Sequence, residues 1–328
     1  PRAEHLVPPG QKMGDKLPLV TPRQEKADYQ QADQGKQPEK FEKPKARMLI
    51  YWGCGETVGK GQPRVIDTEK MSAPEFGKAL SGRAGSRQMP PYPRSGWTYG
   101  DWPNAEDRKD VPKDASLVGE HQLKGTYLPD IRFSLDQKRD FMAPVSFSSL
   151  SKTSAGAWPF QWQQIPTAIG YFATAMGHNQ STGETIFWSS SEIPETGFAL
   201  MDYLTPADVQ RLINERVVMP SSNTSCTIPA GVFKNIEGAV LQFTAYGEEL
   251  NIIYPPRPKD PKQPWNPQWS VKVRLKSTGM SPLVEPEENE HKPSKRRPSS
   301  EIDEQEARPS GTGGRGAAME GLKGLFGF

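Results

Sequence analysis

The sequence predicts an all-β protein: an antiparallel β-sandwich with one inserted helix and long disordered or extended tails. Three observations lead to this fold class. Short segments with alternating apolar and polar residues recur through the middle of the chain. Turn-forming residues are abundant, with 33 prolines and 30 glycines among 328 residues. A strong amphipathic helix pattern is seen at 205–218, within an otherwise strand-like body.

Both ends of the chain have the composition of tails. Residues 1–46 are polar, contain two aromatic residues and have no apolar period. Such a segment buries too little surface to offset its backbone entropy, so we expect an extended arm that is disordered by itself. Leu17, Leu19 and Val20 would be its contacts with the body. Residues 280–328 are again charged and apolar-poor, which predicts a disordered tail and leaves 47–279 as the sandwich body.

The body begins with an apolar run at 47–55 that ends in glycine, which is typical of a buried strand. Residues 56–114 are rich in proline, and we predict a long loop there. Further strands are expected near 115–124, 130–136, 157–165, 170–177, 184–191, 239–246, 249–254 and 268–277.

The last of these strands has the cleanest alternation in the chain. Three apolar residues, Val271, Val273 and Leu275, are expected to face the core. The residues between them form a basic stripe, which we define as Lys272, Arg274 and Lys276. The stripe either meets an acidic partner or blocks pairing at a strand edge.

The inserted helix has a recognisable start. Thr205 is placed to cap the N-terminus, Pro206 takes the first helical position, and Asp208 would complete an acidic variant of the capping box. An apolar stripe then follows at helical spacing, formed by Val209, Leu212, Ile213 and Val217.

Part of the body resembles a known family. Residues 162–171 read Trp-Gln-Gln-Ile-Pro-Thr-Ala-Ile-Gly-Tyr, which resembles the turn between strands B and C of a fibronectin type III domain. Residues 227–233, 238–246 and 268–277 then resemble strands E, F and G. The resemblance covers roughly 130–278 and implies a fibronectin type III or Ig-like sandwich. The segment that carries the helix interrupts it, which leaves the strand order open.

The whole chain also resembles a group of exported bacterial proteins of unassigned function, through the segments at 49–55 and 188–192. This resemblance implies export. The first residue is Pro1, for which removal of a signal peptide and an arbitrary chain boundary are equally good explanations. In an exported protein, Cys54 and Cys226 are expected to form a disulfide. In a cytosolic protein they would be small buried hydrophobic residues.

Composition argues against several functions. Lysine and arginine number 41 against 39 acidic residues, a net charge of +2 that gives no basis for nucleic-acid binding. No apolar run approaches the ~20 residues of a membrane helix. Histidine and cysteine spacings predict no metal site, and the glycines at 53–61 lack the spacing of a phosphate loop. We therefore expect no cofactor.

No catalytic residue is predicted either. The three serines at 189–191 lack the nucleophile elbow of a hydrolase. A hydrolase with an unrecognised site stays open as a second alternative, with Glu192, Glu195 and Asp202 as the nearby carboxylates.

An aromatic cluster in the long loop is a candidate ligand site. Trp97, Tyr99 and Trp102 lie in a polar, proline-bounded stretch. Exposed rings of this kind stack on sugars or anchor a protein partner. The alternative is that the loop crosses the sandwich and the rings cap its core.

The C-terminal end is a candidate docking motif. Met319, Leu322, Leu325 and Phe326 share one helical face, and Phe328 ends the chain. A short apolar motif on a polar tether is a common way to dock into a groove. Weak contact with a membrane surface and the absence of any role are the alternatives.

Together these features favour a non-catalytic, exported protein of the periplasm or cell surface. We expect it to bind other proteins as a structural or accessory component of a cell-envelope assembly. The alternative is a carbohydrate-binding module that uses Trp97, Tyr99 and Trp102.

Overall fold

The computed structural model describes residues 3–21, 46–86, 96–104, 106–107, 110–126, 128–236 and 238–284. These residues all belong to one compact unit, Pro1–Pro286. Of the expected C-terminal tail at 280–328, residues 285–328, including the apolar end motif, lie outside the described residues. The body extends slightly further than predicted, because the last strand continues to Leu283.

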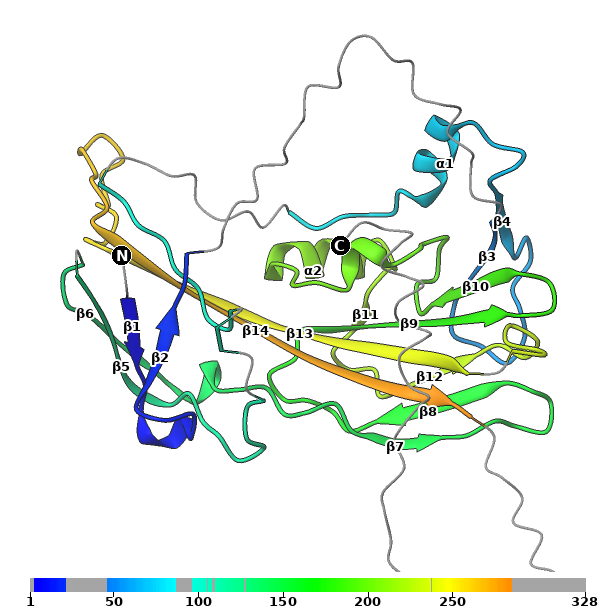
Figure 1. The fold of residues 1–328 in the computed structure, drawn as a ribbon, viewed down its shortest axis with the longest axis horizontal. Helices are drawn as coiled ribbons and strands as arrows, with labels where there is room; N and C mark the ends of the chain where they lie inside the picture. The colour runs from blue at the N-terminus through cyan, green and yellow to red at the C-terminus, as the bar shows by residue number, and fades with distance from the viewer. Residues whose placement is uncertain are drawn as a thin grey trace, which may run out of the picture. The chain divides into compact units, whose positions relative to one another are not determined.

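The prediction of an all-β fold is confirmed, with strands in three sheets and two α-helices among the described residues (Figure 1). The largest sheet has the order β14-β13-β9-β10-β3-β4, and β11 pairs with β9. Neighbouring strands are antiparallel except for β3 and β10, which run parallel. Its strands are β3 (Arg47–Trp52), β4 (Arg64–Asp67), β9 (Gly170–Asn179), β10 (Glu184–Ser189), β11 (Met219–Pro220), β13 (Ala239–Tyr254) and β14 (Trp269–Leu283).

A three-stranded sheet packs on this large sheet and completes a sandwich. Its order is β12-β8-β7. The two sheets share a core of aromatic side chains, in which Trp162 of β8 lies 4.7 Å from Phe243 of β13 between ring centroids. Burial of rings of this size dominates the stability of such a core. The strands are β7 (Phe147–Leu150), β8 (Trp158–Trp162) and β12 (Ser225–Ile228).

Helix α2 (Pro206–Asn214) contributes to a second apolar cluster, in which Leu212 packs with Phe172 of β9 and Tyr246 of β13. Thr205 caps the helix as predicted, because its hydroxyl accepts the Asp208 amide at 3.2 Å. The expected capping box is wrong. The Asp208 carboxylate instead accepts the Thr205 hydroxyl and the Ser86 amide, both at 2.7 Å.

Burial alone would raise the pKa of Asp208, but these bonds and Arg211 outweigh it and lower the pKa to about 2. The carboxylate therefore stays charged and fixes the chain at Ser86 to the start of α2.

The described part of the N-terminal segment lies against the body and forms strands there. Residues 3–19 form a hairpin that pairs with β5 in a four-stranded sheet of order β2-β1-β5-β6. Leu17 is only 1% exposed. The expected contact of Leu17 with the body is therefore confirmed. The strands themselves were not predicted, because each is four residues long and β1 gains its second partner, β5, from a distant part of the chain. The elements are β1 (Ala3–Leu6), η1 (Pro9–Gln11), β2 (Lys16–Leu19), β5 (Gly119–Gly125) and β6 (Ile131–Leu135).

The segment at 56–114 is not only loop. It contains β4 and helix α1 (Ala73–Leu80), which opens with a complete capping box between Ser72 and Glu75. The remaining short helices of the described chain are η2 (Gln137–Arg139) and η3 (Phe198–Leu200).

The hairpin of β13 and β14 belongs to two environments. The two strands predicted at 239–246 and 249–254 are one strand, with a register irregularity between Tyr246 and Glu249. We call Ala239–Tyr246 with Lys276–Leu283 the inner half, which also pairs with β9. We call 249–254 with 269–274 the outer half. It leaves the sandwich and packs against the four-stranded sheet (Figure 1).

Candidate binding cavity

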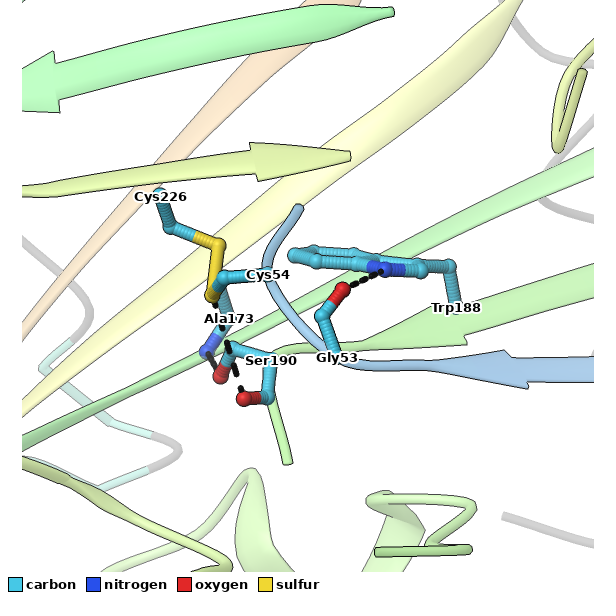
Figure 2. The surroundings of a disulfide bond; sticks show 6 residues. All are labelled: Gly53, Cys54, Ala173, Trp188, Ser190 and Cys226. Atoms are coloured by element: carbon cyan, nitrogen blue, oxygen red, sulfur yellow. Dashed lines mark hydrogen bonds between the residues drawn. A yellow bond between two sulfur atoms is a disulfide. The ribbon is translucent and has the colours of Figure 1, made fainter. Parts of the chain in front are cut away.

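The two cysteines form a structural cross-link. Cys54, in the turn after β3, is bonded to Cys226 of β12, with an S–S distance of 2.08 Å (Figure 2). The bond ties the end of β3 in the large sheet to the three-stranded sheet. Beside it, the Trp188 indole N–H donates to the Gly53 carbonyl at 3.0 Å. A sulfur in a disulfide is not a thiolate, so Cys54 in this state has no nucleophilic role.

The serines at 189–191 are held by backbone groups. Ser189 and Ser191 donate to main-chain carbonyls at 3.0 and 2.8 Å, and Ser190 accepts the Ala173 amide at 3.0 Å (Figure 2). The nearby carboxylates each have a different basic neighbour: Glu192 lies near Arg216, Glu195 near Arg83, and Asp202 near Lys276. Each of these serines and carboxylates therefore has a partner in the surrounding chain.

A cavity of about 1290 Å³ lies between the four-stranded sheet and the outer half of the hairpin. Its walls come from β5 and β6 on one side and from Ser270–Thr278 of β14 on the other. The N-terminal hairpin and the loop at 98–103 complete it. Apolar side chains form much of its wall, and many polar and charged side chains form the rest.

Two histidines, one buried and one partly buried, form a polar pair in this wall. His5 of β1 and His121 of β5 are joined by a hydrogen bond of 2.9 Å between Nε2 and Nδ1. The other His121 nitrogen lies 2.7 Å from the Leu117 carbonyl oxygen, which can only accept. His121 Nε2 therefore carries a proton, His121 Nδ1 is the acceptor, and His5 Nε2 is the donor. Phe133 stacks on the His121 ring at 5.0 Å between centroids.

The pair is neutral near pH 7. Burial and then the charge of His121 lower the pKa of His5 to about 4. Burial also lowers the pKa of His121, although the Leu117 carbonyl and Glu120 oppose it. His5 lies in the segment that the sequence indicated as an N-terminal arm, and no local pattern there predicted its contact with His121. Only the pairing of β1 with β5 brings the two rings together.

Gln11 is the most unusual residue in the wall. Its side chain is fully buried, and neither its amide oxygen nor its amide nitrogen has a hydrogen-bond partner in the described structure. An unsatisfied buried polar group costs about 1–3 kcal/mol. Gln11 belongs to the wall, but its amide atoms expose no surface to the cavity, so a ligand does not reach them in this conformation. Nothing in the polar segment around Gln11 signals this burial.

The aromatic loop contributes two of its three predicted residues. Tyr99 and Trp102 line the cavity, whereas Trp97 is not part of its wall and is 43% exposed. The Trp102 indole N–H donates to Asp107 at 3.4 Å. Burial raises the pKa of Tyr99, so its phenol stays protonated as a potential donor. The loop is tied to the N-terminal hairpin by backbone bonds between Asp101 and Val20.

Both faces of β14 line the same cavity. The predicted alternation of this strand is confirmed, with Leu275 buried and Val271 and Val273 packed on the four-stranded sheet. The basic stripe of Lys272, Arg274 and Lys276 projects from the opposite face and also lines the cavity. Because β14 is the last strand in the order of its sheet, its outer edge lies between these two faces, within the cavity.

Acidic groups only partly balance the basic stripe. Lys272 and Arg274 share the carboxylate of Glu249, at 3.4 and 3.2 Å. Lys276 lies 3.4 Å from Asp202, whose side chain is 89% exposed. Two carboxylates thus face three basic groups, so the stripe keeps an excess of one positive charge.

Comparison with known proteins found no matching family model, no matching curated protein and no matching solved structure. In the part of the chain that the structure describes, no helix has the length and apolar character of a membrane span. The described residues also contain no group of three or more histidine, cysteine or acidic side chains arranged to hold a metal ion.

Proposed function

We propose that the protein is a non-catalytic binding protein and that its partner is another protein, which enters the cavity beside β14. The observation that carries this proposal is the cavity along the outer edge of β14, where apolar side chains and the basic stripe line the same wall. Volume supports a macromolecular partner, since about 1290 Å³ exceeds the ~300–1,000 Å³ of pockets for small molecules.

The sandwich itself is proposed to be fibronectin type III-like. Strand order supports this. Strands β7, β8 and β12 would correspond to A, B and E, and they face β10, β9, β13 and β14, which would be C′, C, F and G. The segment with α2 lies between β10 and β12, where the sequence pattern places an insertion. Sandwiches of this kind serve many functions and mostly bind or space other proteins, so the function must come from the site.

We also propose that the protein is exported and acts in a cell-envelope assembly, at the periplasm or cell surface. The bond between Cys54 and Cys226 supports this location, because disulfides persist mainly in oxidising compartments.

A comparison of two tryptophan substitutions tests the binding site. Ser270 is exposed at the cavity wall, so Ser270→Trp should obstruct the cavity. Ser149 of β7 is also an exposed strand serine but lies outside that wall, so Ser149→Trp is the matched control. After cross-linking in the native host, the wild type and Ser149→Trp should recover the same partner, and Ser270→Trp should lose it. Equal recovery with both variants would contradict the proposal.

The C-terminal motif needs its own test, since Met319, Leu322, Leu325, Phe326 and Phe328 lie outside the described residues. A chain that ends at Gly316 should still recover the partner if the cavity is the main site. Loss of the partner from this shorter chain, together with full recovery by Ser270→Trp, would assign binding to the C-terminal motif instead.

Carbohydrate binding is the second candidate, because Tyr99 and Trp102 both line the cavity. Stacking of a sugar on Trp102 would shift tryptophan emission when envelope glycans are added, and Trp102→Ala would remove that shift. Unchanged emission across a broad glycan panel would exclude this candidate.

A further inference from the structure

We infer that the partner binds as an extended segment that adds as a strand to the outer edge of β14, along Ser270–Thr278, with acidic side chains facing the basic stripe. This inference rests on the proposed function and names the chemistry of the partner. It predicts a backbone ladder as the main contact, with side chains that set the preference.

The position of the edge supports strand addition. In the described structure β14 pairs with β13 on one side, and the sheet has no strand on its other side. All nine residues from Ser270 to Thr278 line the cavity, including those of both faces. A strand of this length spans roughly 30 Å. The cavity therefore follows the edge itself and gives an added strand room along it.

Pro282 shows which backbone groups point toward this edge. It lies opposite Val240 and has no N–H to give to β13, so its position must be one whose N–H would point outward. Backbone direction alternates along a strand, so the N–H groups of Met280, Thr278 and Lys276 also point outward. Along the ladder between β13 and β14, the pair of Lys276 with Tyr246 is followed by the pair of Arg274 with Glu249.

Over this step β13 advances from Tyr246 to Glu249, whereas β14 advances by two residues. The extra residue is therefore on β13, and β14 keeps its alternation through Arg274 and Lys272. The outward-pointing amides of the cavity segment thus belong to the basic stripe, Ser270 and Thr278.

Charge selects the occupant. A second copy of the same edge would bring two basic stripes together, and this like-charge contact opposes self-pairing. An acidic segment is attracted instead, because Glu249 and the exposed Asp202 only partly balance Lys272, Arg274 and Lys276. The opposite face of the added strand would meet the apolar wall around Val273, so acidic and apolar residues should alternate in the partner.

The first experiment uses a pool of fluorescein-labelled eight-residue peptides in which acidic and apolar residues alternate. Binding to the full chain is followed by fluorescence anisotropy. Thr278→Pro removes one outward N–H at the cavity, and binding should weaken roughly two- to tenfold, as expected for one lost hydrogen bond. Met280→Pro removes the next outward N–H beyond the cavity wall, so it is the matched control and should bind like wild type.

The charge contribution has a separate pair of variants. Lys276→Gln should weaken binding of the acidic pool and reduce its salt dependence. Lys124→Gln removes an exposed lysine of β5 that lies outside the cavity wall, and it should leave binding unchanged. A pool in which lysine replaces the acidic residues should bind more weakly than the acidic pool.

Hydrogen exchange gives an independent readout that does not depend on a proline variant. When the acidic pool is bound, the amides of Lys272, Arg274, Lys276 and Thr278 should gain protection. Those of Val273 and Leu275 should change little, because they already face β13. Equal gains at all these amides, or equal loss of binding in Thr278→Pro and Met280→Pro, would overturn strand addition. If no peptide of the pool binds while Ser270→Trp still loses the whole partner, the proposed function stands and the extended-segment inference fails.

Discussion

The two halves of the β13–β14 hairpin are one continuous ladder in two different environments. The inner half is part of an aromatic core, where Phe243 is 1% exposed and contacts rings from both sheets of the sandwich. The outer half packs on the four-stranded sheet with one face only, and that face is only partly covered by the sheet. Leu250, Ile252, Val271 and Val273 are partly buried against the four-stranded sheet.

This contrast separates stability from binding along a single pair of strands. In the close-packed inner half, every contact adds to the stability of the fold. In the outer half, the space beside the wall leaves surface available to a partner. The irregularity between Tyr246 and Glu249 marks the change from one environment to the other. Bulges commonly re-aim a strand next to a functional site.

The largest expected effect comes from truncating one side chain in each half. Phe243→Ala should lower the free energy of unfolding by about 3–5 kcal/mol, because it leaves a cavity in a packed aromatic core. Val273→Ala should cost only about 1 kcal/mol, because its side chain is already half-exposed to the cavity. Denaturant unfolding measures both values, and equal losses would contradict the contrast.

The disulfide comes next. Replacing Cys54 and Cys226 together with alanine should cost about 2–5 kcal/mol, since the bond closes a long loop between the sheets that build the inner core. The midpoint of urea unfolding, with and without a reductant, measures this contribution. A wild-type midpoint that reductant leaves unchanged under conditions that fully open the bond would show that the sheets hold together without it.

A pH dependence should come from the cavity side. In the folded protein the pKa of His5 is about 4, below the usual histidine value of 6.5, mainly because His5 is buried. Between these values the unfolded chain binds more protons, so stability is complete above pH 6.5 and is lost as the pH falls toward 4. The loss should reach about 2–3 kcal/mol.

His5→Gln keeps a donor for His121 but does not titrate, so it serves as the control for this pH effect. Its unfolding free energy should fall less than that of wild type between pH 6.5 and 4. Parallel curves for the two proteins would contradict the assigned origin of the effect.

The smallest stability effect concerns Gln11. Gln11→Leu should stabilise the free protein by about 1 kcal/mol, because it removes an unsatisfied buried amide. Denaturant unfolding measures the change, and a variant less stable than wild type would contradict an unsatisfied amide at this position.

Local patterns predicted much of the sandwich. The alternation through Val271, Val273 and Leu275 and the cap at Thr205 depend on neighbouring residues, so sequence periodicity was sufficient. Helix α1 could have been found from the capping box of Ser72 and Glu75, but the prolines around it favoured a loop.

The cavity could not be predicted in this way. Its polar centre requires His5 to meet His121 across β1 and β5, a contact between segments that are far apart in the chain. Gln11 is informative only through its burial, which no local pattern encodes. The aromatic cluster was a partial guide, since Tyr99 and Trp102 reach the cavity wall while Trp97 does not.

The most direct test of the account is site-specific photo-cross-linking in the native host, with a photoreactive phenylalanine in place of Ser270 and, separately, in place of Ser149. Both positions are exposed strand serines, but only Ser270 lines the cavity. The account predicts a defined cross-linked protein from position 270 and none from position 149. The same product from both positions, or no product from position 270, would contradict a protein-binding cavity beside β14.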